Sequence, residues 1–127
     1  MPDLNIAIRS LEHALSTMPT AGSWRALVAN RVQALRDAYL QEVEHGPTSD
    51  TFALDAPWVC GRMQVLRREQ SRIVEELESL ARAPFEAMDL DTVRAQVQLA
   101  LQRISRLRQR ENDLIYESVD LDIGGEQ

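Results

Sequence analysis

The side chains in this sequence best suited to metal binding or nucleophilic chemistry are two histidines and one cysteine. Glu42 and His45 stand three residues apart, which is the Glu-x-x-His spacing found in di-metal four-helix bundles. His45 is expected to end one helix and Cys60 to begin the next, so Glu42, His45 and Cys60 form a candidate site for zinc or another divalent metal. The structural alternative is a histidine that favours a helix C-terminus and a small buried thiol.

Four carboxylates form a second pattern, Glu75-x-x-Glu78 followed by Glu86-x-x-Asp89. It resembles the Glu-x-x-Glu…Glu-x-x-Asp motif of all-α nucleotide pyrophosphohydrolases of the MazG-like kind, which implies a magnesium site on two facing helices. Here Pro84 interrupts a short gap, and Glu86 and Asp89 fall in the connection rather than on a facing helix. A solvated acidic face is therefore the preferred interpretation.

Four segments show the apolar spacing of amphipathic helices, and proline or glycine separates each from the next. The first spans about Asp3 to Thr17, and the second begins near Ser23 and ends at His45. The third begins near Pro57 and ends before Pro84, and the fourth begins near Asp89 or Asp91. The predicted fold is all-α, an antiparallel up-down-up-down four-helix bundle over residues 1–117, with residues 118–127 as an extended or flexible acidic tail.

The third and fourth segments can be aligned as a helical hairpin. In that alignment Glu69 flanks the third apolar stripe where Arg103 flanks the fourth, and the two are expected to pair. Gln70 falls within the third apolar stripe, where a polar residue typically sets the register of packed helices.

Composition limits the classes of partner. The net charge is −6, and all 14 basic residues are arginine. A negative net charge argues against non-specific binding to nucleic acid or anionic membrane. The N-terminus lacks the pattern of a signal peptide, and there is a single cysteine, so we expect a cytoplasmic protein. The use of arginine alone as the basic residue indicates a GC-rich coding genome, and we expect a bacterial protein.

Charge is segregated along the C-terminal third. From Thr92 to Arg110 there are five arginines and no acid, and from Glu111 to Gln127 there are six acids and no base. After Tyr116 the sequence alternates apolar and acidic residues, which suits an extended segment that docks on its own bundle or on a partner. The expected partner-binding residues are Arg103, Arg106, Arg110, Tyr116, Val119, Leu121 and Ile123.

The end of the chain reads Asp113-Leu114-Ile115-Tyr116-Glu117 and then Asp122-Ile123-Gly124-Gly125. It resembles the Asp-Leu-x-Tyr-Glu…Asp-Ile-Gly-Gly tail of short helical actinobacterial proteins. The resemblance covers only these last residues and implies no activity.

These patterns favour a non-catalytic protein–protein interaction or regulatory bundle that binds a protein partner or forms a homodimer, without a cofactor. The alternative is a metal-dependent helical enzyme or metal-binding protein that uses Glu42, His45 and Cys60.

Overall fold

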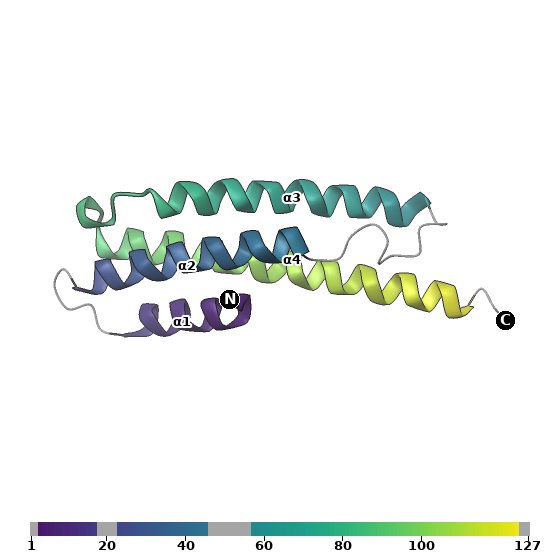
Figure 1. Cartoon of the computed structure of the whole chain (residues 1–127), viewed down its shortest axis with the longest axis horizontal. Coiled ribbons are helices and arrows are strands. Elements are labelled where there is room, and N and C mark those ends of the chain that lie inside the picture. The colour runs from purple at the N-terminus through teal and green to yellow at the C-terminus, as the bar shows by residue number, and fades with distance from the viewer. Residues whose placement is uncertain (1–2, 18–22, 46–56, 125–127) are drawn as a thin grey trace.

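The computed structural model describes residues 3–17, 23–45 and 57–124, with the backbone alone at 57, 59 and 118–124. Every regular element in this part of the chain is helical, as predicted (Figure 1). The helices are α1 (Leu4–Ser16), α2 (Ser23–His45), α3 (Pro57–Ala81), the 3₁₀ helix η2 (Phe85–Ala87) and α4 (Leu90–Gly124). None of the described helices combines the length and the apolar character that crossing a bilayer requires.

The helix starts follow from local chemistry. Asp3 caps α1, because its carboxylate accepts a 3.0 Å hydrogen bond from the backbone N–H of Asn5. Pro57 is the first residue of α3, where a missing N–H costs nothing. The N–H of Val93 donates to the carbonyl of Asp89 at 3.0 Å, which closes the first turn of α4.

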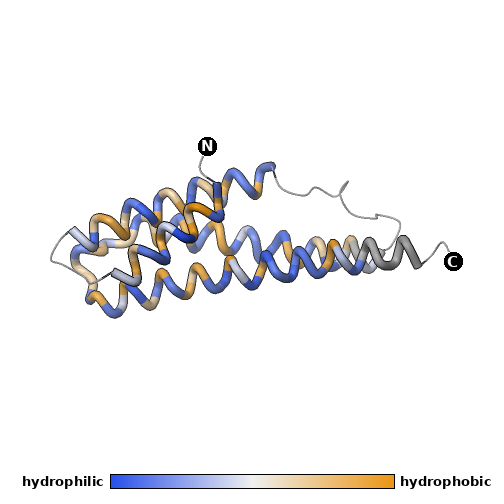
Figure 2. The backbone as a smooth tube through the Cα atoms, turned by 90° about the horizontal axis from the view of Figure 1, so that it is seen from below, coloured by the Kyte–Doolittle hydropathy of each residue, from blue (hydrophilic) through white to orange (hydrophobic). Residues whose placement is uncertain are grey.

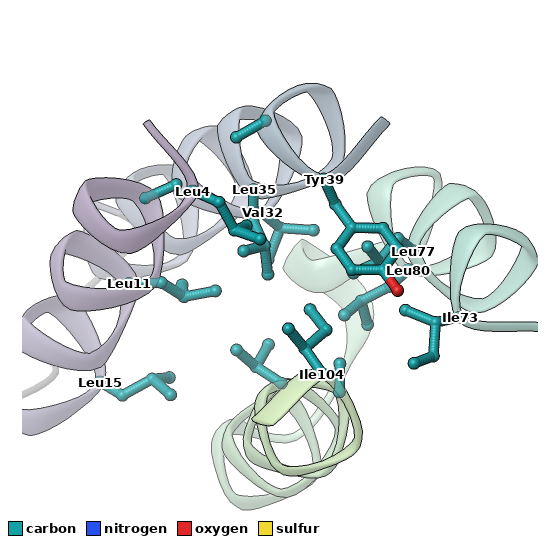
Figure 3. Packing of buried hydrophobic residues seen from close by; sticks show 14 of the residues in the cluster. Leu4, Leu11, Leu15, Val32, Leu35, Tyr39, Ile73, Leu77, Leu80 and Ile104 are labelled. Atoms are coloured by element: carbon teal, nitrogen blue, oxygen red, sulfur yellow. The ribbon is translucent and has the colours of Figure 1, made fainter. Parts of the chain in front are cut away.

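One hydrophobic core joins the helices, as Figure 3 shows for side chains that converge from all four. α1 packs on α2, and α3 packs on both α2 and α4. Hydrophobic and hydrophilic bands follow one another along each helix in Figure 2. The buried hydrophobic residues recur at helical spacing, so each helix turns an apolar stripe to the core. The fully buried large residues are Leu11, Val28, Val32, Leu35, Leu77, Val93, Val97, Ile104 and Leu107.

The connection between α3 and α4 is itself part of the core. Phe85, in η2, is only 4% exposed, and η2 packs against α2. The connection is closed by backbone hydrogen bonds from Phe85 N–H to the Ala83 carbonyl and from Ala87 N–H to the Pro84 carbonyl, both 2.9 Å. Residues 82–89 therefore connect α3 to α4 by a longer path that buries Phe85, rather than by a tight turn.

At the other end, α3 and α4 continue side by side beyond the end of α2 (Figures 1 and 2). We call residues 57–69 of α3 and 113–124 of α4 the arm. The extended conformation expected for residues 118–127 is wrong for 118–124, which continue α4 as helix to Gly124. The alternation over residues 119–123 is too short to distinguish a strand from a helix. The helix ends at Gly124, the first glycine after Glu111. Residues 125–127 lie outside the described part, as does the connection 46–56.

Candidate functional site

The structure separates the predicted metal ligands into two places. Glu42 and His45 line one cavity, together with Gln70 of α3, but Cys60 is not part of it. Cys60 is half-buried ten residues before Gln70, or about 15 Å along α3. The expectation that the end of α2 meets the start of α3 is therefore wrong, because α3 begins well beyond the level of His45. Within the described residues, no three His, Cys, Asp or Glu side chains are placed to hold a metal ion.

The four carboxylates of the second pattern do not face one another across two helices. Glu75 and Glu78 lie on α3, whereas Glu86 belongs to η2 and Asp89 precedes α4. Glu75, Glu86 and Asp89 are exposed, which agrees with a solvated acidic surface.

The cavity at the end of α2 has a volume of about 470 Å³, and all four helices contribute to its wall. Leu4, Ala38 and Ile115 form the apolar part of the wall. Its polar lining consists of Gln41, Glu42, His45, Gln70, Arg108, Glu111 and Asn112.

At this cavity Arg108 of α4 contacts polar side chains of both α1 and α2. One of its guanidinium nitrogens donates a 2.8 Å hydrogen bond to Oδ1 of Asn5, and the other lies 3.7 Å from Oε1 of Glu42. The pKa of Glu111 is raised by burial and by the charge of Glu42, while Arg108 opposes both effects. Burial, followed by the charges of Glu111 and Glu42, also raises the pKa of Tyr39, which keeps that phenol neutral. The cavity can receive a polar group, and Glu111 can exchange a proton at higher pH than an ordinary carboxyl.

The unusual position of Glu111 could have been recognised in the sequence, but the metal-site hypothesis did not include this residue. Glu111 occupies a position in the apolar stripe of α4 between Leu107 and Leu114, so a carboxylate interrupts an otherwise buried series. Nothing in the sequence brings Arg108 to Asn5, because that contact joins residues 103 positions apart.

A second surface lies on the side of the α3–α4 pair that faces solvent. Three ion pairs follow one another along it: Arg62 with Glu117, Glu69 with Arg110 at 2.5 Å, and Glu76 with Arg103. Each step of seven residues along α3 is matched by seven in the reverse direction along α4. Ion pairs at a heptad interval fix the register of two packed helices.

The predicted pair of Glu69 with Arg103 is wrong by one heptad, since Glu69 pairs with Arg110. With Glu76 facing Arg103, the last residue of α3 is level with residue 98. α4 therefore begins about two turns beyond the end of α3. The connection supplies this offset, because it extends past the end of α3 to bury Phe85.

Three shallow cavities of about 280, 410 and 330 Å³ lie in a row along this surface and mark a groove between α3 and α4, in which neighbouring cavities share the lining residue Arg110 or the pair Glu76 and Arg103. We call the lining residues of this groove the outer face. On α3 its main members are Arg62, Val65, Glu69, Arg72 and Glu76. On α4 they are Leu99, Arg103, Arg106, Arg110, Asp113 and Glu117.

Large apolar side chains are exposed on or near the outer face. Val65 is 43% exposed and Leu99 is 47% exposed, at opposite ends of the groove. Tyr116 on the arm is 72% exposed. Of the predicted partner-binding residues, the structure brings Arg103, Arg106 and Arg110 to the outer face, and Tyr116 lies beside them in sequence. Val119, Leu121 and Ile123 lie in α4, but their side-chain positions are outside the described part.

No protein-family model, curated protein or solved structure matches this chain.

Proposed function

We propose that this protein acts by association rather than catalysis, as an antiparallel up-down-up-down helical bundle that binds a protein through its outer face. The topology is supported by the packing of α1 on α2, of α3 on both α2 and α4, and by the heptad ion pairs, whose numbering runs in opposite directions on α3 and α4.

The single observation that carries the function is the groove between α3 and α4. A third helix laid along two packed helices contacts both of them, and this is a common way in which bundles bind helical partners. Here the groove extends onto the arm, where α3 and α4 are the only helices among the described residues (Figure 1). Val65 and Leu99 supply exposed apolar contacts at its two ends, and charged side chains lie between them.

The metal-binding alternative has weaker support, since the structure does not gather Glu42, His45 and Cys60 into one site.

Site-specific photo-crosslinking in the cells that make the protein tests this proposal. A diazirine-bearing residue is placed at Leu99 or at Tyr116, and a matched control is placed at Ile6, an equally apolar position on α1 that is 65% exposed. We expect a covalent adduct of one discrete mass from positions 99 and 116 and none from position 6. The absence of an adduct from both position 99 and position 116, or the same adduct from position 6, contradicts the proposal.

A further inference from the structure

Five charged residues of α4 form a stripe on the outer face. Going along the helix, this stripe contains Arg103, Arg106 and Arg110, followed by Asp113 and Glu117. The intervals of three and four residues keep these side chains on one side of a helix.

The charges of this stripe are complementary to those of an identical stripe that runs in the opposite direction, because basic positions then meet acidic ones. Arg106 and Arg110 on one side and Asp113 and Glu117 on the other are symmetric about a point between residues 111 and 112. In an antiparallel pair of identical helices, residues equally distant from the two-fold axis face each other. Arg110 would then face Asp113 of a second copy, and Arg106 would face Glu117.

The charge distribution is unfavourable for α4 on its own. The C-terminal end of a helix favours cations, yet from Glu111 onward the sequence contains six acids and no base. Arg106 is exposed in the middle of the helix, and Asp113 is exposed beyond the boundary between the two charge types. A second copy in the reversed orientation brings arginines to the acidic half and acids to the basic half of each helix.

The ion pairs within one chain are compatible with this arrangement. Arg103 and Arg110 each hold a glutamate of α3, and Glu117 holds Arg62. A guanidinium has five N–H donors and a carboxylate has two oxygens, so each group can bind a second partner. The Arg106 side chains of the two copies would stand about 16 Å apart along the axis, beyond the screening length at physiological salt.

We propose that two copies of this chain associate through the outer face with their α4 helices antiparallel and centred between residues 111 and 112. This inference rests on the proposed function and names the partner as a second copy. The stretch Thr92–Arg110 without acids and the acidic stretch after it are the two halves of one self-complementary surface.

Sedimentation equilibrium of charge-reversed variants tests the pairing. Arg106→Glu and Glu117→Arg, measured separately at low salt, should each raise the dissociation constant of the dimer by about tenfold or more. The double variant should return it to within about threefold of the unaltered protein, because the pair is restored with its signs exchanged. Arg31→Glu makes the same charge change on the exposed side of α2 and should leave the dissociation constant unchanged.

Rescue in the double variant discriminates between local and intermolecular effects. Glu117→Arg loses its ion pair with Arg62 in both the single and the double variant, so only a contact between copies can restore dimerisation. Circular dichroism shows whether each variant remains helical. Raising sodium chloride from about 0.05 to 0.5 M should weaken the dimer of the unaltered protein by about tenfold or more.

A monomeric unaltered protein, or a double variant no better than the single ones, overturns the dimer. The proposed function fails separately, when photo-crosslinking from positions 99 and 116 gives no adduct. An adduct of twice the chain mass supports both proposals, and a discrete adduct of any other mass supports the function and contradicts the dimer.

Discussion

The indole nitrogen of Trp24 donates a buried 2.9 Å hydrogen bond to the backbone carbonyl of Ala14. This carbonyl belongs to the last turn of α1, where carbonyls have no partner within the helix. It also accepts a 2.7 Å hydrogen bond from the hydroxyl of Thr17. The guanidinium of Arg94 lies 5.5 Å from the centre of the indole ring. Trp24 therefore ties the end of α1 to α2 and to the first turns of α4.

Replacing Trp24 with phenylalanine should lower the free energy of unfolding by about 2 kcal/mol. The change removes a buried hydrogen bond, reduces the apolar contact area and weakens the contact with Arg94. Urea denaturation followed by circular dichroism measures the effect. Trp58→Phe is the matched control, since Trp58 is 36% exposed, and its cost should stay below about 1 kcal/mol. Equal effects at the two positions would contradict the role given to Trp24.

A double-mutant cycle on Glu69 and Arg110 should give a coupling energy of about 0.2–1 kcal/mol. The side chain of Arg110 is 49% exposed and that of Glu69 is 34% exposed, so solvent screens their attraction. The same cycle on Glu69 and Arg103 should give a coupling near zero, because these residues are a heptad apart in the observed register. A coupling energy that is larger for Glu69 with Arg103 than for Glu69 with Arg110 would support the register predicted from the sequence and contradict the observed one. All variants are compared at one protein concentration, since association stabilises the folded state.

Glu111→Gln should stabilise the protein at pH 7 by less than about 1 kcal/mol. The pKa of Glu111 is raised in the folded state by burial and by Glu42, so folding favours the protonated carboxyl. Its contribution to the free energy of unfolding therefore falls as pH rises through the window above the ordinary value of about 4.3.

Thermal unfolding at pH 4 and pH 7 checks the sign of this effect. The gain from Glu111→Gln should be present at pH 7 and nearly absent at pH 4. The other titratable groups around this cavity, Glu42, His45, Arg108 and Tyr39, are the same in both proteins. Glu75→Gln, on the exposed side of α3, is the control and should show no such difference. An equal gain at both pH values would mean that the charge of Glu111 is not its cause.

The helices could be predicted from the sequence because their signals are local. Apolar spacing indicated stripes such as Val93, Val97 and Ile104, and these residues are fully buried. The ends at His45 and near Pro57 follow from neighbouring glycine and proline. Residues 118–124 were misassigned because alternation over five residues fits both extended and helical structure.

The relative positions of the helices could not be predicted, since they depend on contacts between distant residues. Phe85 was not recognised as a core residue, although its burial accounts for the one-heptad error in the pairing of Glu69. For the same reason the sequence predicted that Cys60 lies beside His45, whereas in the structure Gln70 is the α3 residue that lines the cavity with His45. The identity of the outer-face arginines was predictable from charge segregation, but their ion pairs with α3 were not.

Because α4 is one continuous helix, its length fixes the distance between its two ends. Its 35 residues correspond to about 52 Å, whereas the 23 residues of α2 correspond to about 34 Å. In the proposed antiparallel dimer the four-helix ends would lie on opposite sides of the central axis, joined by continuous helix rather than by a flexible linker. The dimer would then act as a rigid spacer, and whatever binds the two ends would be held at a separation fixed by the rise of a helix.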